Sequence, residues 1–322
     1  MQHFGVGQRS NLSVGPIAAP SARQGLAAPG RAVVVPQQSG NASCPTCNGN
    51  GGGVENAAAE SEVGQATYPF VFALGRIEAR FPTLGIEKEF NQAIGGAQNS
   101  GLTNQQVLQA TFEDRRYRYI ARQMCWVLTI EGVETYLLQP RDPSDFDLLV
   151  ESLRPIPRAT DVDVVVGLRG PLAPPEMCNA LMIPVVMLSQ IYSFEVPDLI
   201  ESIPRPEQVA EDRFGDAAEA VFLMIQQMAD NAGATDEHRA LNYLAVRYPA
   251  IYHAAADAFG RNASLAGVDV RPSRLSGVRR IVDVIFGFTD RATDVTEKFF
   301  VRVDVTEEFP FLVSRLAPFF ER

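Results

Sequence analysis

The sequence predicts an α+β fold: one domain with a mixed or antiparallel sheet and a helical block, preceded by a disordered N-terminal tail. Short runs of apolar and aromatic residues, typical of strands, occur at both ends of residues 68–322. Between them, residues 204–262 repeat apolar side chains at helical spacing. Because helices and strands fall into blocks and do not alternate one for one, this arrangement is favoured over a doubly wound parallel sheet.

The tail comprises residues 1–67 and is rich in Gly, Ala, Ser, Pro, Gln and Asn. It has few large apolar side chains and no sustained period, so it cannot bury enough surface to offset the entropy of ordering. Its three Arg and three Glu cancel, which places the whole net charge of -10 in residues 68–322. We therefore expect a disordered low-complexity segment followed by one folded domain.

The first part of the folded domain is expected to mix strands and helices. Residues 70–77 are apolar and aromatic, which indicates a strand. Leu108 and Phe112 lie near one face of a helix, and Pro143 suits the first turn of another. The expected strands are 70–77, 125–130, 134–139, 161–168 and 183–196, and the expected helices are 85–94, 104–122 and 143–153.

The second part is expected to be helical first and rich in strands afterwards. Gly233 suits the left-handed C-cap of one helix. Thr235 can cap the next helix, with Asp236 and Glu237 favourably placed in its first turn. The expected strands are 265–271, 278–288 and 297–305, followed by a short helix over 309–318.

Composition excludes several classes of partner. The chain has 28 Lys and Arg residues against 38 Asp and Glu residues, and an acidic chain binds phosphate backbones poorly over a broad surface. It contains no run of 18 or more apolar residues, as a membrane-spanning helix requires. The N-terminus also lacks the residue order of a secretory signal. We therefore expect a cytoplasmic protein without nucleic-acid or membrane partners.

A search for catalytic motifs finds no P-loop, nucleophile elbow, zinc-protease helix or complete dinucleotide fingerprint. The sequence therefore favours a non-enzymatic role. The alternative is an enzyme, a hydrolase or peptide modifier, with an unrecognised active site. Its first candidates would be Asp161, Asp163, Glu176, His238 and Arg239. For the carboxylates, helix capping and solubility are the simpler explanation.

Cysteines carry the most specific chemistry in the sequence. Cys44 and Cys47 have the two-residue spacing that lets a tight turn place both thiolates on one zinc ion. Cys125 and Cys178 are the other two thiols, and a structural zinc site using all four cysteines would tether the tail to the folded domain. Two alternatives remain: a two-cysteine site completed by another chain, and no metal, with Cys125 and Cys178 as small core residues.

Four segments resemble the C-terminal domain of the cyanobactin maturation proteins PatA and PatG. They are residues 118–136, 168–178, 230–249 and 293–309. The resemblance covers nearly all of residues 68–322 and the Cys-Pro-x-Cys segment. In that family the domain follows subtilisin-like protease or macrocyclase modules, which cut and cyclise a ribosomally made precursor peptide. This chain leaves no room for such a module before residue 68 and has no protease motif, so we expect the protease on another chain.

The resemblance implies association with a pathway that modifies ribosomally made peptides. Together with the missing catalytic motifs and the expected structural zinc, it favours an accessory domain that binds a precursor peptide or a partner protease. An exposed strand edge could accept an extended peptide by main-chain pairing. Arg115, Arg116 and Arg118 could attract an acidic leader segment, although a solvated face with local ion pairs is the simpler explanation. A homodimeric scaffold is a further alternative.

Overall fold

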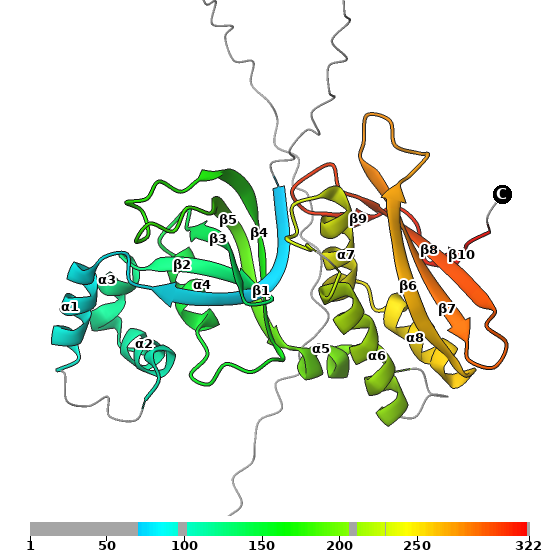
Figure 1. The fold of residues 1–322 in the computed structure, drawn as a ribbon, viewed down its shortest axis with the longest axis horizontal. Coiled ribbons are helices and arrows are strands. Elements are labelled where there is room, and N and C mark those ends of the chain that lie inside the picture. Colours follow the sequence, from blue (N-terminus) through cyan, green and yellow to red (C-terminus); the bar gives the residue numbers. More distant parts are fainter. Residues whose placement is uncertain (1–69, 96–101, 206–210, 229, 321–322) are drawn as a thin grey trace, which may run out of the picture. The chain divides into compact units, whose positions relative to one another are not determined.

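The computed structural model places its described residues in one compact unit, Val63–Arg322. The described residues are 70–95, 102–205, 211–228 and 230–320. The predicted disordered tail, with Cys44 and Cys47, lies outside them. Helices and two separate sheets make up the described part of the chain (Figure 1), so the predicted α+β class is confirmed.

Five strands close into a barrel in the order β1-β2-β3-β5-β4. They are β1 (Phe70–Arg80), β2 (Cys125–Ile130), β3 (Val133–Gln139), β4 (Asp161–Leu172) and β5 (Pro184–Glu195). Neighbouring strands are antiparallel except β3 and β5, which are parallel. The barrel is therefore a mixed sheet without a free edge.

Strand β1 closes the barrel because it changes partner along its length. Residues 70–75 pair with β4, and residues 76–80 pair with β2. Gly75 stands at the change, where an added Cβ would lie 2.6 Å from the carbonyl oxygen of Thr129. A side chain there would force β1 and β2 apart, so glycine permits the close approach that the closure needs.

The barrel interior is a continuous apolar core. Alternate residues from all five strands belong to one buried cluster, as period-two alternation requires. Examples from successive strands are Val71, Trp126, Leu138, Val165 and Val186. The same cluster includes buried residues of the first helices, which lie beside the barrel in Figure 1. These helices are α1 (Leu84–Ala93), α2 (Asn104–Glu113), α3 (Arg118–Ala121) and α4 (Asp145–Ser152).

The single helix predicted over 104–122 is in fact broken. Helix α2 ends at Glu113, and Asp114 adopts an extended conformation. The Asp114 carboxylate then accepts a hydrogen bond from the Arg116 main-chain N–H at 2.9 Å. An aspartate side chain that bonds a nearby main-chain N–H competes with helix propagation, and a short 3-10 turn follows before α3 begins.

The described residues after β5 form four helices and a second sheet. The helices are α5 (Val196–Ser202), α6 (Glu211–Gln226), α7 (Asp236–Arg247) and α8 (Ala250–Gly260). The strands are β6 (Ala263–Pro272), β7 (Ile281–Asp290), β8 (Thr296–Asp304), β9 (Phe311–Leu312) and β10 (Ala317–Pro318). The predicted cap of α7 is confirmed, since the Thr235 hydroxyl accepts from the main-chain N–H of His238. No helix of the described residues has the length and apolarity to cross a bilayer.

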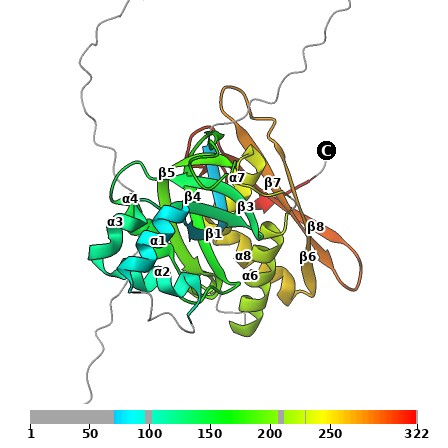
Figure 2. The same cartoon turned by 60° about the vertical axis from the view of Figure 1, so that its left-hand side comes forward.

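Helices α6, α7 and α8 lie between the barrel and the second sheet, as both ribbon views show (Figures 1 and 2). One large buried cluster joins the three layers. It contains Phe72 and Val164 from the outer face of the barrel, Phe222 from α6, Leu241 from α7 and Val284 from β7. Strands β1 and β4 are therefore buried on both faces, which explains their nearly continuous apolar runs.

The prediction of a short helix over 309–318 is wrong. Two short strands, β9 and β10, occupy this segment and pair with the outer edge of β8. Phe311 lies opposite Asp304, and Ala317 lies opposite Phe300. The unpaired main chain of β8 supplies hydrogen bonds that local spacing cannot reveal, so tertiary pairing overrides the helical pattern.

Candidate functional site

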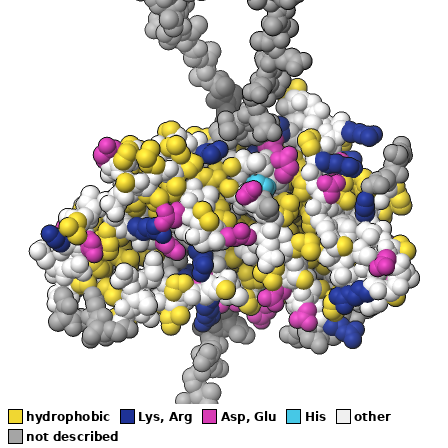
Figure 3. All heavy atoms as spheres, viewed as in Figure 1, with side chains coloured by type: hydrophobic (Ala, Val, Ile, Leu, Met, Phe, Trp, Pro, Cys, Tyr) yellow, Lys and Arg dark blue, Asp and Glu magenta, His cyan; other side chains and the backbone are white. Residues whose placement is uncertain are grey.

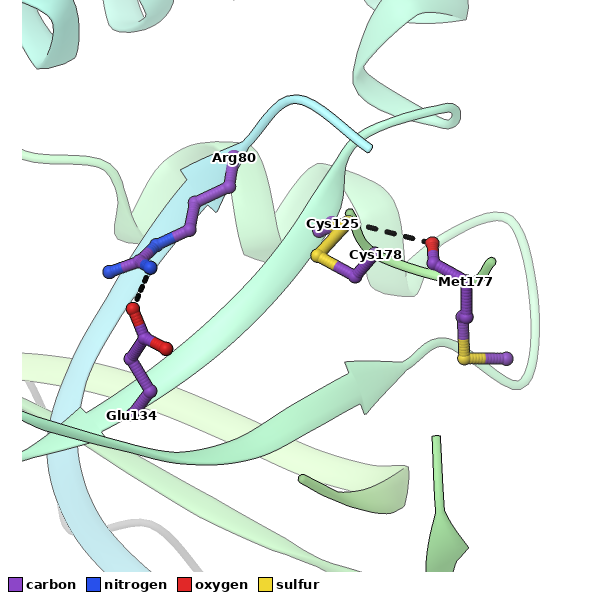
Figure 4. The surroundings of a disulfide bond; sticks show 5 residues. All are labelled: Arg80, Cys125, Glu134, Met177 and Cys178. Carbon is purple, nitrogen blue, oxygen red and sulfur yellow. Dashed lines mark hydrogen bonds and ion pairs between the residues drawn. A yellow bond between two sulfur atoms is a disulfide. The ribbon is translucent and has the colours of Figure 1, made fainter. Parts of the chain in front are cut away.

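Cys125 and Cys178 lie side by side and form a disulfide, with their Cα atoms 5.9 Å apart (Figure 4). Cys125 begins β2, and Cys178 belongs to the connection between β4 and β5. Both side chains are buried against Val127 and Leu137 on the outer face of the barrel. The bond therefore fastens the β4–β5 connection to the barrel wall.

The structure thus brings together two of the four cysteines of the predicted zinc site, while Cys44 and Cys47 fall outside the described residues. Within the described ranges, no group of three or more His, Cys, Asp or Glu side chains could hold a metal ion. Zinc binds thiolates, so Cys125 and Cys178 could act as ligands only after reduction of their disulfide. The four-cysteine site stays a prediction.

Asp161 and Asp163 share one side of β4, as the sequence predicted, and both are buried. The Asp163 carboxylate accepts hydrogen bonds from the main-chain N–H of Ile77, at 2.6 Å, and from the hydroxyl of Ser193. Asp161 accepts from the main-chain N–H of Arg158 at 2.7 Å. Asp163 therefore ties β4 to β1 and β5 where β1 changes partner.

Burial raises the pKa of Asp163 to about 6, although its hydrogen bonds with Ser193 and Ile77 favour the charged form. The low dielectric around the carboxyl disfavours its negative charge. A carboxyl with such a pKa could take up a proton near neutral pH. Buried structural carboxyls and catalytic carboxyls both show raised pKa values, so the shift alone does not assign a catalytic role to Asp163.

The other candidates for an active site lie elsewhere. Glu176 is exposed on the β4–β5 connection. Arg239 on α7 is fully buried, and its guanidinium donates to the carbonyls of Val305, at 2.7 Å, and of Glu308, at 3.1 Å. Burial lowers the pKa of Arg239 to about 10 and lowers the pKa of its neighbour His238 as well.

The candidate residues therefore occupy three settings: the inner side of β4, an exposed connection, and α7. In the described part of the chain, no hydrogen bond or ion pair joins one setting to another. Arg239 acts as a clamp that satisfies carbonyl groups after β8, while Asp163 does the same for a main-chain N–H of β1. The geometry gives these groups structural tasks in separate places.

Two of the three arginines in the predicted basic cluster form local ion pairs. Arg116 pairs with Asp114 at 2.6 Å, and Arg118 forms an ion pair with Asp147. On the face seen in Figure 3, basic and acidic side chains are scattered and do not gather into one patch. This arrangement fits a solvated face with ion pairs, the simpler explanation that the sequence allowed.

The outer edge of β6 is the surface that sequence reasoning could not locate. Strand β6 pairs with β7 on one side only and ends its sheet. The main-chain N–H of Ser273, just after β6, donates to the main-chain carbonyl of Ile281 on β7 at 2.8 Å. By alternation along the strand, the main-chain groups of Val268 and Val270 then face away from β7. Within the described residues, no main-chain hydrogen bond reaches this edge from another element.

A cavity of about 290 Å³ adjoins the same edge on the face of the second sheet. It begins at Ala266 and Gly267 on β6 and extends past Gly287 to Phe319. The two glycines have no side chains to fill the space. The site therefore combines a row of free main-chain groups with a recess beside them, which is the pattern that binds extended peptides.

Comparisons with known proteins agree with the sequence motifs. Residues 208–319 match the family model described as PatG C-terminal. A solved structure described as the PatG domain of unknown function superposes with a TM-score of 0.64 at 21% identity, covering 78% of this chain and 99% of that chain. Among curated proteins, no sequence matches. The resemblance predicted from the motifs is thereby confirmed: residues 208–319 are similar to the PatG C-terminal family, and the fold resembles that of the PatG domain of unknown function.

Proposed function

We propose that this chain is a non-enzymatic accessory domain of a cyanobactin-like pathway for ribosomally made peptides, and that it binds an extended precursor peptide along β6. The observation that carries the proposal is the free edge of β6, with the main-chain groups of Val268 and Val270 facing outward. Such an edge offers hydrogen bonds to any extended chain whatever its sequence. The similarity of residues 208–319 to the PatG C-terminal family supports the choice of pathway.

The recess beside β6 supports the same role because it can distinguish between peptides. Side chains of an added strand would alternate between the two faces of the sheet, and one on the outer face could enter the space above Gly267 and Gly287. Asp269 and Lys298, which carry opposite charges, both line this space. An uncharged side chain is therefore the expected occupant.

The proposal is tested by a proline at Val270, compared with alanine at the same position. Proline removes the outward N–H but leaves the β7 ladder intact, and proline is tolerated on strand edges. Val270→Ala trims the same side chain and keeps the N–H. Binding of a fluorescently labelled precursor peptide from a cyanobactin-like pathway is measured by fluorescence anisotropy.

We expect Val270→Pro to weaken binding about tenfold, since a lost main-chain hydrogen bond and poorer strand docking together amount to about 1.4 kcal/mol. Val270→Ala should bind within about twofold of the native chain, the range of a small loss in packing. Equal affinities for the native and proline chains would contradict the β6 site. Capture of a subtilisin-like protease with no peptide binding would favour the protease as the partner.

We also propose that a structural zinc ion is held by Cys44, Cys47, Cys125 and Cys178 when the disulfide is reduced. The adjacent positions of Cys125 and Cys178 fit two corners of a tetrahedral sulfur site. The remaining two ligands must come from beyond the described residues, because no third ligand lies near the pair within them. The Cys-Pro-Thr-Cys segment has the required spacing.

A further inference from the structure

A cavity of about 230 Å³ lies where the barrel meets α6 and α7. Leu74 and Arg76 of β1 line it on one side and Thr129 of β2 on another. Asn242 of α7 and Asn231, which precedes that helix, also line it. The cavity is smaller than the pockets of about 300–1,000 Å³ that take drug-sized ligands. Its size therefore suits a single polar group.

Thr129 is the first sign that the cavity binds something. The residue is only 7% exposed, and its hydroxyl has no hydrogen-bond partner in the described part of the chain. Buried hydroxyls nearly always find a partner, because an unsatisfied one has lost its hydration without compensation. A ligand in the cavity could supply the missing partner.

Asn231 and Asn242 bond to each other and leave acceptor capacity free. The Asn231 amide nitrogen donates to the carbonyl of Ile225, at 3.3 Å, and to the side-chain oxygen of Asn242, at 2.8 Å. The Asn242 amide nitrogen donates to the carbonyl of Phe72, at 2.8 Å, and to the side-chain oxygen of Asn231, at 3.1 Å. All four amide hydrogens are used, whereas each oxygen accepts one bond and can accept a second.

The edge of β1 is interrupted at the same place. The N–H of Phe72 donates to Gly233, and the carbonyl of Phe72 accepts from Asn242. Pairing with β2 begins only at Arg76, opposite Thr129. Leu74 lies between these two covered positions, and alternation directs its main-chain groups to the same side. The cavity therefore adjoins Leu74, whose main-chain groups face away from β4 between the contacts of Phe72 and the pairing with β2 at Arg76.

We propose that this cavity binds a primary carboxamide, the group at the end of an asparagine or glutamine side chain. Arg76 could donate to the carbonyl oxygen of the amide, and Asp161, which also lines the cavity, could accept from its NH₂ group. Asp161 would repel a carboxylate, and Arg76 would repel an ammonium group. This cavity shares no residue with the β6 site, so the inference does not depend on the peptide-binding proposal.

The test uses two small probes that differ at one group. N-acetyl-glutamine N-methylamide carries the carboxamide, and N-acetyl-glutamate N-methylamide carries a carboxylate of nearly the same shape. Each is titrated into the full chain and followed by amide NMR shifts of Leu74 and Thr129. We expect saturable shifts with the glutamine probe and at least tenfold weaker binding of the glutamate probe.

Thr129→Val then removes the hydroxyl at nearly constant volume. We expect it to weaken binding of the glutamine probe about fivefold without lowering the melting temperature, because the native hydroxyl has no partner to lose. Thr135→Val on β3 is the matched control and should bind as the native chain does. Arg76→Gln, at an exposed position, provides a second variant that should fold and bind the glutamine probe more weakly.

Three results would overturn the inference: no saturable shift with the glutamine probe, equal binding of the two probes, or native-like binding by both Thr129→Val and Arg76→Gln. None of these results bears on the β6 site. Peptide binding that is lost in Val270→Pro and kept in Thr129→Val would separate the two sites directly.

Discussion

The barrel and the second sheet manage their strand edges in opposite ways. The barrel closes on itself, so every one of its strands has two neighbours. The second sheet is open: the short strands β9 and β10 cover the outer edge of β8, while β6 keeps one side free. A free edge is prone to aggregation unless it is short, covered or used. The contrast therefore indicates the free edge of β6 as the candidate binding surface.

The two regions also differ in how their surroundings shift the pKa of a buried carboxyl. On β4 of the barrel, burial raises the pKa of Asp163 to about 6. On β8 of the second sheet, burial also favours the neutral form of Asp304, but its hydrogen bonds with Arg279 and Thr306 outweigh burial and lower its pKa. A pKa that differs between the folded and unfolded states makes stability depend on pH. The two carboxyls should therefore make stability respond to pH in opposite directions.

The largest expected effect concerns the covalent link of the barrel. Cys178→Ser opens a disulfide with a sequence separation of 53. Under oxidising conditions we expect it to lower the free energy of unfolding by about 4 kcal/mol, the value for constraining a loop of that length. Denaturant melts with and without reductant give the measurement, and the difference between native and variant chains should vanish in reductant.

The same variant tests the proposed zinc site. Reduced native chain should bind one zinc ion with a gain in melting temperature, and both Cys178→Ser and Cys44→Ser should lose that ion. Zinc content measured by mass spectrometry decides the matter. Binding that survives in Cys44→Ser would remove the tail from the ligand set, and no binding by the native chain would exclude the site.

The next largest effect concerns the junction between the two regions. Gly233 has a φ of 68°, and an added Cβ would lie 2.3 Å from the carbonyl oxygen of Phe72. We expect Gly233→Ala to lower the free energy of unfolding by about 3 kcal/mol, combining left-handed backbone strain with overpacking.

Gly215→Ala serves as the matched control for Gly233. Gly215 lies in α6, and an added Cβ there would meet no atom within 4 Å. Alanine should stabilise that helix by about 1 kcal/mol. If Gly233→Ala were as stable as the native chain, the junction would be looser than the contact between Gly233 and Phe72 indicates.

The smallest of the three effects is the pH dependence of Asp163. Its pKa is raised to about 6 from 3.8, so the folded state holds this proton more tightly than the unfolded state. The resulting stability is fully present below pH 4 and is lost as the pH rises through 6, amounting to about 2 kcal/mol over that interval.

Asp163→Asn isolates this contribution. Its side-chain oxygen can accept from Ile77 and its NH₂ group can donate to Ser193, so the hydrogen bonds survive without the charge. The variant should gain on the native chain as the pH rises from 4 to 6, as measured by urea melts. Parallel pH profiles for the two chains would show that Asp163 has an ordinary pKa.

Local patterns were sufficient for much of the fold. Apolar alternation and turn residues predicted β2 and β3, and the Thr235 cap predicted the start of α7, because these features depend on neighbours in the chain. The long helix over 104–122 and the last helix over 309–318 were wrong. The Asp114 carboxylate accepts from the main-chain N–H of Arg116, and β8 pairs with the final segment. Both outcomes depend on competition between hydrogen bonds that periodicity does not register.

The candidate sites divide in the same way. The count of thiols placed Cys125 and Cys178 together in one expected zinc site, but nothing in the sequence predicted the disulfide between them. Nothing in the sequence marked Val270 or Thr129. The sequence pattern of an edge strand does not differ from that of a central strand. Nor does the sequence around a threonine show whether its hydroxyl has a hydrogen-bond partner.

By itself, the sequence determined the resemblance to the PatG C-terminal domain, through its long motifs. It also determined the α+β class and most element positions, because these follow from side-chain period and capping over a few residues. Only the tertiary structure decided that β1 divides its pairing at Gly75, that the barrel closes, and that β6 keeps a free edge. Those outcomes depend on which main-chain groups meet across long sequence separations. That choice is made by packing as the whole domain folds.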